Sequence, residues 1–337
     1  RRGHPDLAAL NHDLYRGVGK GRFWVMEQQA GPVNWAPYNL IPAPGMVRLW
    51  TLEAIAHGAE VISYFRWRQV PFAQEQMHSG LLRPDSTPDI GYYEVKKVAE
   101  ELAKINIPPI GKSPVALILD YEAAWVFEIQ PHGKDVSYAH LVFQFYSALR
   151  QLGLDVDVVP PGVSLEGYRL VVIPSLPIVS KKALESLKNF SGIVVFGPRT
   201  GSKTETFTIP LNLPPGPLQE LLPLKVTQVE SLPLKMEKMY WRGQEYPVGI
   251  WKERLETELK PEMTFANGKG AAFHHKNYYY LAFWPNERLL VDFFAQLARE
   301  VALNVKRLPQ GLRLQRRGDL VFAFNFADQV SKVPAPT

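Results

Sequence analysis

Short apolar runs alternate with stretches of helical periodicity over the first hundred residues. Phe23-Trp24-Val25-Met26 follows a glycine-rich turn, and Val61-Ile62-Ser63-Tyr64-Phe65 is a second largely apolar run. Both runs predict buried β-strands. Apolar residues recur at helical spacing between and around them, which predicts helices over residues 7–15, 46–56 and 92–105.

Long polar loops follow only the strands in this segment. The repeated order of strand, loop and helix is typical of the last two units of a (β/α)8 barrel, whose chemistry lies on the loops at the carboxyl ends of the strands. A whole barrel needs roughly 250 residues. The barrel segment, residues 1–110, ends within the proline-containing linker at 107–111 and is far shorter than that, so we expect the first six units to be missing from this chain.

The pattern changes after the linker. Residues 111–306 again alternate strands with helices, which predicts an open, mostly parallel sheet. Within this segment, an irregular β-rich stretch covers about 205–260. The segment 307–337 holds two runs of period two and predicts the opening hairpin of a small antiparallel domain. Strands are expected at 115–119, 155–159, 170–173 and 193–197, hairpins at 271–283 and 312–324, and helices at 138–152, 181–187 and 286–301.

Composition narrows the class of protein. Hydrophobic residues make up 46% and charged residues 21%, as in a folded globular chain. The net charge of +5 is too dilute over 337 residues to indicate nucleic-acid binding, and the short basic cluster at Arg313, Arg316 and Arg317 is interpreted as a solvated strand edge. An aromatic content of 12% fits an aromatic-lined cleft as well as a thick core.

Cysteine is absent, which excludes disulfides, thiolate zinc sites and a cysteine nucleophile within these residues. The 29 prolines, together with the absence of cysteine, weakly favour a thermophilic protein. No apolar run approaches about 18 residues and no signal peptide opens the sequence, so we expect a cytoplasmic protein without a membrane partner.

Glu27 is the strongest candidate for a catalytic residue. It directly follows a predicted strand, where its carboxylate would point to the active face of a barrel, although a surface glutamate is the commoner outcome at such a position. Asn34 and Trp35 follow closely. An amide can hold a carboxylate ionised, and an indole can stack on the apolar face of a sugar ring.

The loop after the second strand holds Glu75 and His78. As a metal pair they lack further ligands, since only Asp85 is near. They are better suited to hydrogen-bonding a polyhydroxyl substrate on the same face as Glu27, where Arg66 and Trp67 join them.

Several other motifs have structural explanations. His274 and His275 are neighbours on a predicted strand and so face opposite sides. Asn286-Glu287 suits a helix start. Ser175 follows a strand, as an amidotransferase or hydrolase nucleophile would, but it lacks the Gly-x-Ser-x-Gly frame, so this alternative is set aside.

Four motifs in order resemble glycoside hydrolase family 42 β-galactosidases, and most closely their thermophilic members. The first is similar to the family's nucleophile segment, and all four lie in order within about 70 residues. They are FWVMEQQAGPVNWAP at 23–37, PGMVRLW at 44–50 with AHGA at 56–59, FRWR at 65–68, and EQMHSG at 75–80.

The resemblance implies a retaining β-galactosidase in which Glu27 is the nucleophile, Trp35 stacks on galactose, and Glu75 and His78 bind its hydroxyls. The acid–base glutamate and any structural zinc would belong to a part absent from this chain, so we expect no cofactor here. The implied fold is the end of the barrel, a flavodoxin-like or amidotransferase-like domain at 111–306 that forms a homotrimer, and a truncated β domain. The remaining alternative is a non-catalytic fragment that acts as a sugar-binding or oligomerisation module.

Overall fold

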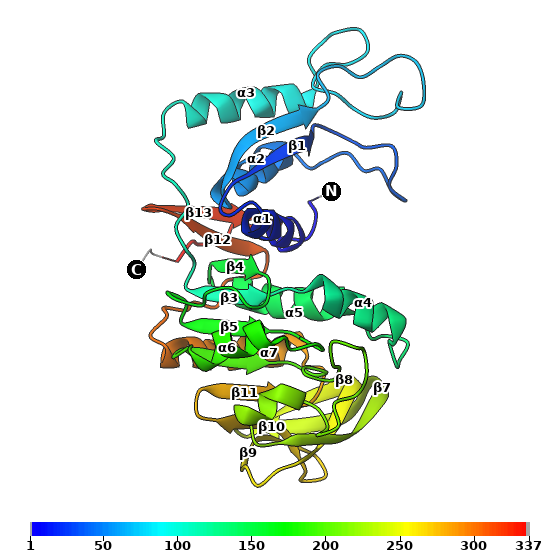
Figure 1. Ribbon diagram of the computed structural model, residues 1–337. Coiled ribbons are helices and arrows are strands. Elements are labelled where there is room, and N and C mark those ends of the chain that lie inside the picture. Colours follow the sequence, from blue (N-terminus) through cyan, green and yellow to red (C-terminus); the bar gives the residue numbers. More distant parts are fainter. Residues whose placement is uncertain (1, 335–337) are drawn as a thin grey trace. The chain divides into compact units, whose positions relative to one another are not determined.

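The computed structural model describes residues 2–334, whose helices and strands fall into two units (Figure 1). The first unit combines the residues up to Gly111 with those from Leu308 onward, and the second contains Lys112–Arg307. Within the described residues, no helix has the length and apolar character needed to cross a membrane.

The first unit contains the two predicted strands as a parallel pair. β1 pairs directly with β2, and α2 packs against both strands and against α3. The order of elements matches the predicted barrel units. The elements are α1 (Leu7–Val18), β1 (Phe23–Gln29), α2 (Met46–Ala56), β2 (Ala59–Phe65) and α3 (Ile90–Leu102).

The prediction that these two strands are buried is wrong for the structure described. Trp24 and Met26 on β1 are 58% and 63% exposed, and Val61 on β2 is also exposed. Among the described residues the sheet has only two strands, so each strand has one edge without a neighbouring strand. The continuous apolar run is the signature of a strand covered on both faces, and these residues lack that cover here.

The hairpin formed by β12 (Leu312–Arg317) and β13 (Leu320–Asn325) belongs to the first unit. Phe324 packs in one apolar cluster with Met46 and Ala56 of α2. Whether residues 307–337 begin a separate β domain stays a prediction.

The basic cluster on this hairpin is not a solvated edge. Arg313 is 5% exposed, and its guanidinium forms an ion pair with Asp6. Arg317 donates from Nε to the carbonyl of Pro108 at 2.7 Å, and from Nη1 to the carbonyl of Ile55. The interpretation as a solvated edge therefore holds only for Arg316, which is exposed.

The second unit contains one nine-stranded sheet in the order β4-β3-β5-β6-β11-β10-β9-β7-β8. Its first five strands run parallel, as predicted. The apolar runs that form them are fully or half buried, as expected for a sheet covered by helices. The first four of these strands and the helices of this unit are β3 (Val115–Ile118), β4 (Val156–Val159), β5 (Leu170–Ile173), β6 (Ile193–Phe196), α4 (Tyr121–Ile129), α5 (Tyr138–Gln151), α6 (Lys181–Lys188) and α7 (Glu287–Glu300).

The β-rich stretch continues the same sheet with antiparallel strands. Its largest part is a long hairpin of β7 and β8, and the expected turn at Lys276-Asn277 joins two shorter strands. The sequence did not predict α4 or β9. The additional elements are the 3₁₀ turn η1 (Gly216–Glu220), β7 (Lys225–Trp241), β8 (Gln244–Glu256), β9 (Pro261–Phe265), β10 (Gly270–His275) and β11 (Tyr278–Leu281).

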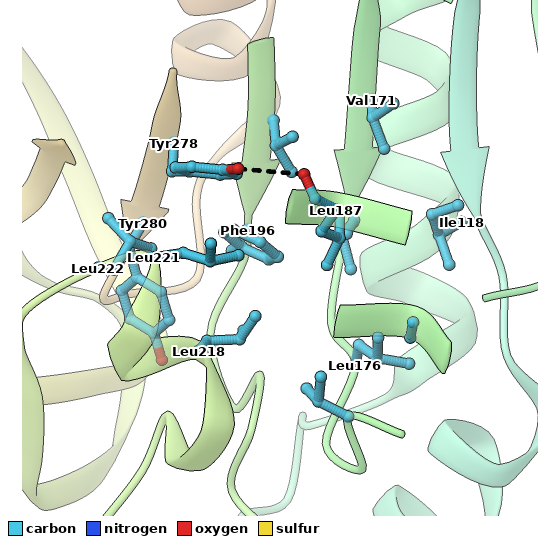
Figure 2. Packing of buried hydrophobic residues seen from close by; sticks show 14 of the residues in the cluster. Ile118, Val171, Leu176, Leu187, Phe196, Leu218, Leu221, Leu222, Tyr278 and Tyr280 are labelled. Carbon is cyan, nitrogen blue, oxygen red and sulfur yellow. Dashed lines mark hydrogen bonds between the residues drawn. The ribbon is translucent and has the colours of Figure 1, made fainter. Parts of the chain in front are cut away.

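One apolar cluster covers the parallel strands of this unit (Figure 2). Val171 on β5 and Phe196 on β6 are completely buried in it. Tyr278 stacks on Phe196 with ring centroids 6.4 Å apart, and its hydroxyl donates to the carbonyl of Leu187 at 3.0 Å, the dashed line in Figure 2. Burial of each such side chain contributes about 1.5–3 kcal/mol to the stability of the fold. The cluster therefore holds in place the parallel strands, whose carboxyl ends lead into the loops of this unit.

Candidate active site

The candidate site begins with an irregularity in β1. Val25 pairs with Ile62 and Gln28 pairs with Tyr64, so three residue steps on β1 face two on β2. One extra residue in a strand is a β-bulge, a feature that turns a side chain away from the regular alternation and is common beside active sites. Glu27 lies within this bulge and is exposed.

The bulge also corrects the predicted end of the strand. The expectation was that β1 ends at Met26 and that Glu27 opens a loop. In the structure the strand resumes beyond the bulge, because Gln28 and Gln29 pair with Tyr64 and Phe65 of β2. Glu27 is therefore held by strand backbone on both sides, which is a more rigid position than a loop.

Hydrogen bonds join the loop after β1 to the loop after β2. The amide of Ser79 donates to the carbonyl of Pro32 at 3.0 Å, and the side-chain amide of Asn34 donates to the carbonyl of Gln74 at 3.2 Å. Gly31 allows this approach, because a Cβ there would lie 2.7 Å from Cβ of Ser79. The structure thus brings together the two loops that carry the predicted substrate contacts.

His78 is buried at the base of the second loop, with 7% of its surface exposed. Its ring meets the ring of Phe65 edge-on, with centroids 5.0 Å apart. Among the described residues, its Nδ1 has no hydrogen-bond partner. Burial lowers the pKa of His78, the charge of Arg66 lowers it further, and Glu27 opposes both effects. The ring is therefore neutral at pH 7, with one nitrogen open, and it is within electrostatic reach of Glu27.

Glu75 forms an ion pair with Arg66, the residue that follows β2. The Arg66 guanidinium in turn lies over the ring of Phe65, 4.4 Å from its centroid. About half of the Glu75 side chain remains exposed (48%), so its carboxylate is oriented by a cation and is still open to a ligand.

Trp35 and Trp67 present aromatic faces to solvent, with 76% and 64% of their surfaces exposed. Tyr38, on the same loop as Trp35, is 84% exposed. An exposed indole ring suits the apolar face of a sugar, so each tryptophan is available to a ligand.

Comparison with known proteins identifies the family. Residues 1–105 match the family model described as β-galactosidase of glycoside hydrolase family 42, and residues 113–304, more than half of the chain, match the model described as its trimerisation domain. The chain belongs to glycoside hydrolase family 42. This confirms the family suggested by the four sequence motifs.

Individual relatives of this family 42 chain agree in sequence and in fold. A β-galactosidase of Thermus thermophilus is 62% identical over 336 residues, which are 99% of this chain and 52% of that protein. The crystal structure of a β-galactosidase from the psychrophilic Marinomonas ef1 is 42% identical, with a TM-score of 0.95 over 99% of this chain and 53% of the other. A β-galactosidase from Halorubrum lacusprofundi is 36% identical with a TM-score of 0.93. The chain spans about half the length of the relatives it matches.

The other motifs of the family 42 chain are structural. Asn286 caps α7 by accepting from the amide of Leu289 at 3.0 Å, as expected. Ser175 is completely buried, which prevents it from reaching a substrate. Among residues 2–334, no cluster of three potential ligands could hold a metal ion.

Two features of the site were missed from the sequence. One is the bulge at Glu27, and the other is Phe65, which supports both His78 and Arg66. The sequence did hold a signal for Phe65, because this residue ends a predicted strand and directly precedes the loop that carries candidate site residues.

Proposed function

We propose that the whole protein is a retaining β-galactosidase and that Glu27 is its nucleophile. The observation that carries the proposal is the bulge of β1, which presents Glu27 beside two joined loops within the segment matched by the β-galactosidase model. The relatives named above are β-galactosidases, and their similarity to this chain includes the same segment. The acid–base carboxyl group is proposed to come from outside residues 1–337.

The proposed reaction has two steps. A carboxylate oxygen of Glu27 bonds to C1 of galactose while the bond from C1 to the leaving oxygen breaks, and the general acid gives its proton to that oxygen. Water then attacks C1, passes a proton to the same group acting as base, and releases Glu27 as a carboxylate. Two inversions at C1 retain the β configuration.

The substrate contacts are proposed to be Trp35, Glu75 and His78. Trp35 offers an exposed indole face to the C–H groups of galactose. The ion pair with Arg66 keeps Glu75 oriented as an acceptor for sugar hydroxyls. The open Nδ1 of the neutral His78 ring supports a hydrogen bond to a further hydroxyl.

Covalent labelling tests the nucleophile in the full-length protein. A dinitrophenyl deoxyfluorogalactoside should leave its sugar on the tryptic peptide 23–48, in which Glu27 is the only acidic residue. Glu27→Gln should abolish labelling and lower kcat more than about a hundredfold, because the attacking oxygen loses its charge. Glu100→Gln, at an exposed position on α3, is the matched control and should keep both. A label on another peptide, or a Glu27→Gln enzyme above a hundredth of the wild-type kcat, would reject this role.

We further propose that the second unit forms the contacts of a homotrimer. The match of residues 113–304 to a trimerisation domain supports this. Sedimentation equilibrium of the full-length protein should give three times the chain mass, and a monomer would contradict it. A cytoplasmic location also stays a prediction.

The alternative applies to residues 1–337 taken alone. Two parallel strands cannot close a barrel, so this segment should bind or assemble without hydrolysing nitrophenyl galactoside. Turnover by the isolated segment would overturn that expectation.

A further inference from the structure

A cavity of about 570 Å³ lies in the second unit, far along the sequence from Glu27. One wall is the loop at 199–203, just beyond the carboxyl end of β6, and another is the segment after α4. In α/β sheets, ligands bind outside the carboxyl ends of parallel strands. A cavity of this size at that position is typical of a small-molecule site.

Arg199 is held in the wall of this cavity and is 6% exposed. Its guanidinium lies 4.2 Å from the ring centroid of Phe127 and 5.0 Å from that of Trp251. It donates to the carbonyls of Gln130 at 2.7 Å and Pro131 at 3.3 Å. Burial lowers the pKa of Arg199 to about 10, so the group remains charged at neutral pH.

A second cation, Lys203, lines the same cavity. Burial lowers the pKa of Lys203, and the charge of Arg199 lowers it further, so the two cations act on each other. Among residues 2–334, neither side chain forms a salt bridge with a carboxylate. Nζ of Lys203 instead lies 5.0 Å from the ring centroid of Phe207.

The carboxylate in the lining, Glu253, is already engaged. Its Oε1 accepts from the backbone amide of Arg199 at 2.7 Å and from the indole of Trp251 at 3.0 Å, and its Oε2 accepts from Tyr280 at 2.7 Å. Burial raises the pKa of Glu253, which disfavours its charged form. The cavity therefore keeps an excess of positive charge.

The backbone around the two cations is restrained in an uncommon conformation. Arg199 has φ of +64° and His132, which also lines the cavity, has φ of +58°. Left-handed backbone at residues other than glycine costs of order 1 kcal/mol and is concentrated at ligand sites. The hydroxyl oxygen of Ser202, in the same loop, is buried and has no partner among the described residues.

We propose that this cavity binds a small organic anion with an apolar body. The anionic head lies between Arg199 and Lys203 and accepts a hydrogen bond from Ser202. The apolar body packs on the side chains of Ile209, Leu213 and Val229. A carboxylate and a phosphate monoester share the required chemistry, and the site is independent of the reaction proposed for Glu27.

Isothermal titration of the full-length protein tests the site. Phenylbutyrate and phenyl phosphate are the two anionic probes, phenylbutyramide is the neutral match, and acetate lacks the apolar body. At least one aromatic anion should bind once per chain, about tenfold or more tightly than the amide and than acetate. The tighter of the two anions identifies the head group.

Lys203→Met is the informative variant, because within the part of the chain that the structure describes the lysine makes no ion pair whose loss would disturb folding. It should weaken binding of the anion at least about tenfold while leaving the amide unchanged. Lys269→Met, at an exposed position in the turn between β9 and β10, is the matched control and should bind as wild type.

Equal binding of anion and amide, an unaffected Lys203→Met variant, or no saturable binding of either anion would overturn the proposal. Hydrolysis of nitrophenyl galactoside should be the same in Lys203→Met as in wild type. Failure of the Glu27 labelling would leave this binding unchanged, so the two proposals fail separately.

Discussion

Removing Asp6 should be among the most damaging single changes to the first unit. Its carboxylate is completely buried, and both oxygens accept from one guanidinium, at 2.6 Å from Nε and 2.7 Å from Nη2 of Arg313. The two residues are 307 positions apart and join the start of α1 to β12. Asp6→Ala leaves the buried cation of Arg313 without its counter-charge.

The magnitude follows from burial. Breaking a buried ion pair by removing one partner costs about 3–5 kcal/mol, since the remaining charge stays away from water. Replacing both partners by apolar groups is often close to neutral. Asp6→Ala combined with Arg313→Met should therefore be much less destabilised than the sum of the two single variants.

Hydrogen exchange of the hairpin reports this change locally, which matters in a chain of two units that need not unfold together. The amides of β12 and β13 should exchange at least about a hundredfold faster in Asp6→Ala, because about 3 kcal/mol corresponds to that factor. The double variant should recover most of the protection.

A matched exposed pair controls for geometry. Arg22 and Glu60 form the same two-pronged contact, at 2.9 Å and 3.1 Å, with the Arg22 side chain 77% exposed. Glu60→Ala should change exchange far less, because exposed pairs contribute little. If Asp6→Ala were no worse than Glu60→Ala, or if the double variant were as unstable as the sum, the argument from burial would be refuted.

Two further predictions concern stability. Burial is the main cause that lowers the pKa of His12 to about 3, whereas the unfolded chain titrates near 6.5. Only the unfolded state gains that proton between pH 6.5 and 3, so stability should fall as the pH falls through this window. In calorimetry, His12→Phe should lose about 2 kcal/mol less than wild type between pH 7 and 5, and equal losses would contradict the assignment. Gly201→Ala should destabilise the second unit by more than about 2 kcal/mol, because φ is +67° and a Cβ would lie 2.0 Å from the carbonyl oxygen of Pro215. Gly268→Ala, with φ of +79° and open space, isolates the conformational cost and should lower the melting temperature less; equal losses would show that the close contact contributes nothing.

Most elements could be predicted from the sequence because their apolar patterns are local. Helix α4 could not, since Tyr121, Trp125 and Ile129 form an exposed apolar row along it while its buried side is also apolar. A helix that is apolar on both sides shows no periodic contrast. The long hairpin of β7 and β8 was only described as β-rich, because its register is irregular between Leu232 and Glu237.

The sequence predicted which positions form the candidate site, but it did not predict the contacts between them. The order of strands and loops was enough to select Glu27, Trp35, Glu75 and His78. The bulge depends on how two strands align, and alignment is not encoded in either strand alone. The support of His78 by Phe65 likewise depends on the return of a loop onto the end of its own strand.

The basic cluster on the hairpin of β12 and β13 was wrongly interpreted as solvated. The physical reason is burial, which is also why removal of Asp6 is predicted to be destabilising. Four consecutive residues of β12, from Leu312 to Gln315, are buried, so both faces of this strand are covered and alternation carries no information about which side faces water. An arginine tolerates that position only where a carboxylate meets it. Asp6 stands at the N-cap position of α1 but makes no side-chain capping bond there, and its oxygens accept from Arg313 instead. The carboxylate of Asp6 therefore serves a distant strand rather than its own helix, and the ion pair allows an arginine to be buried on β12.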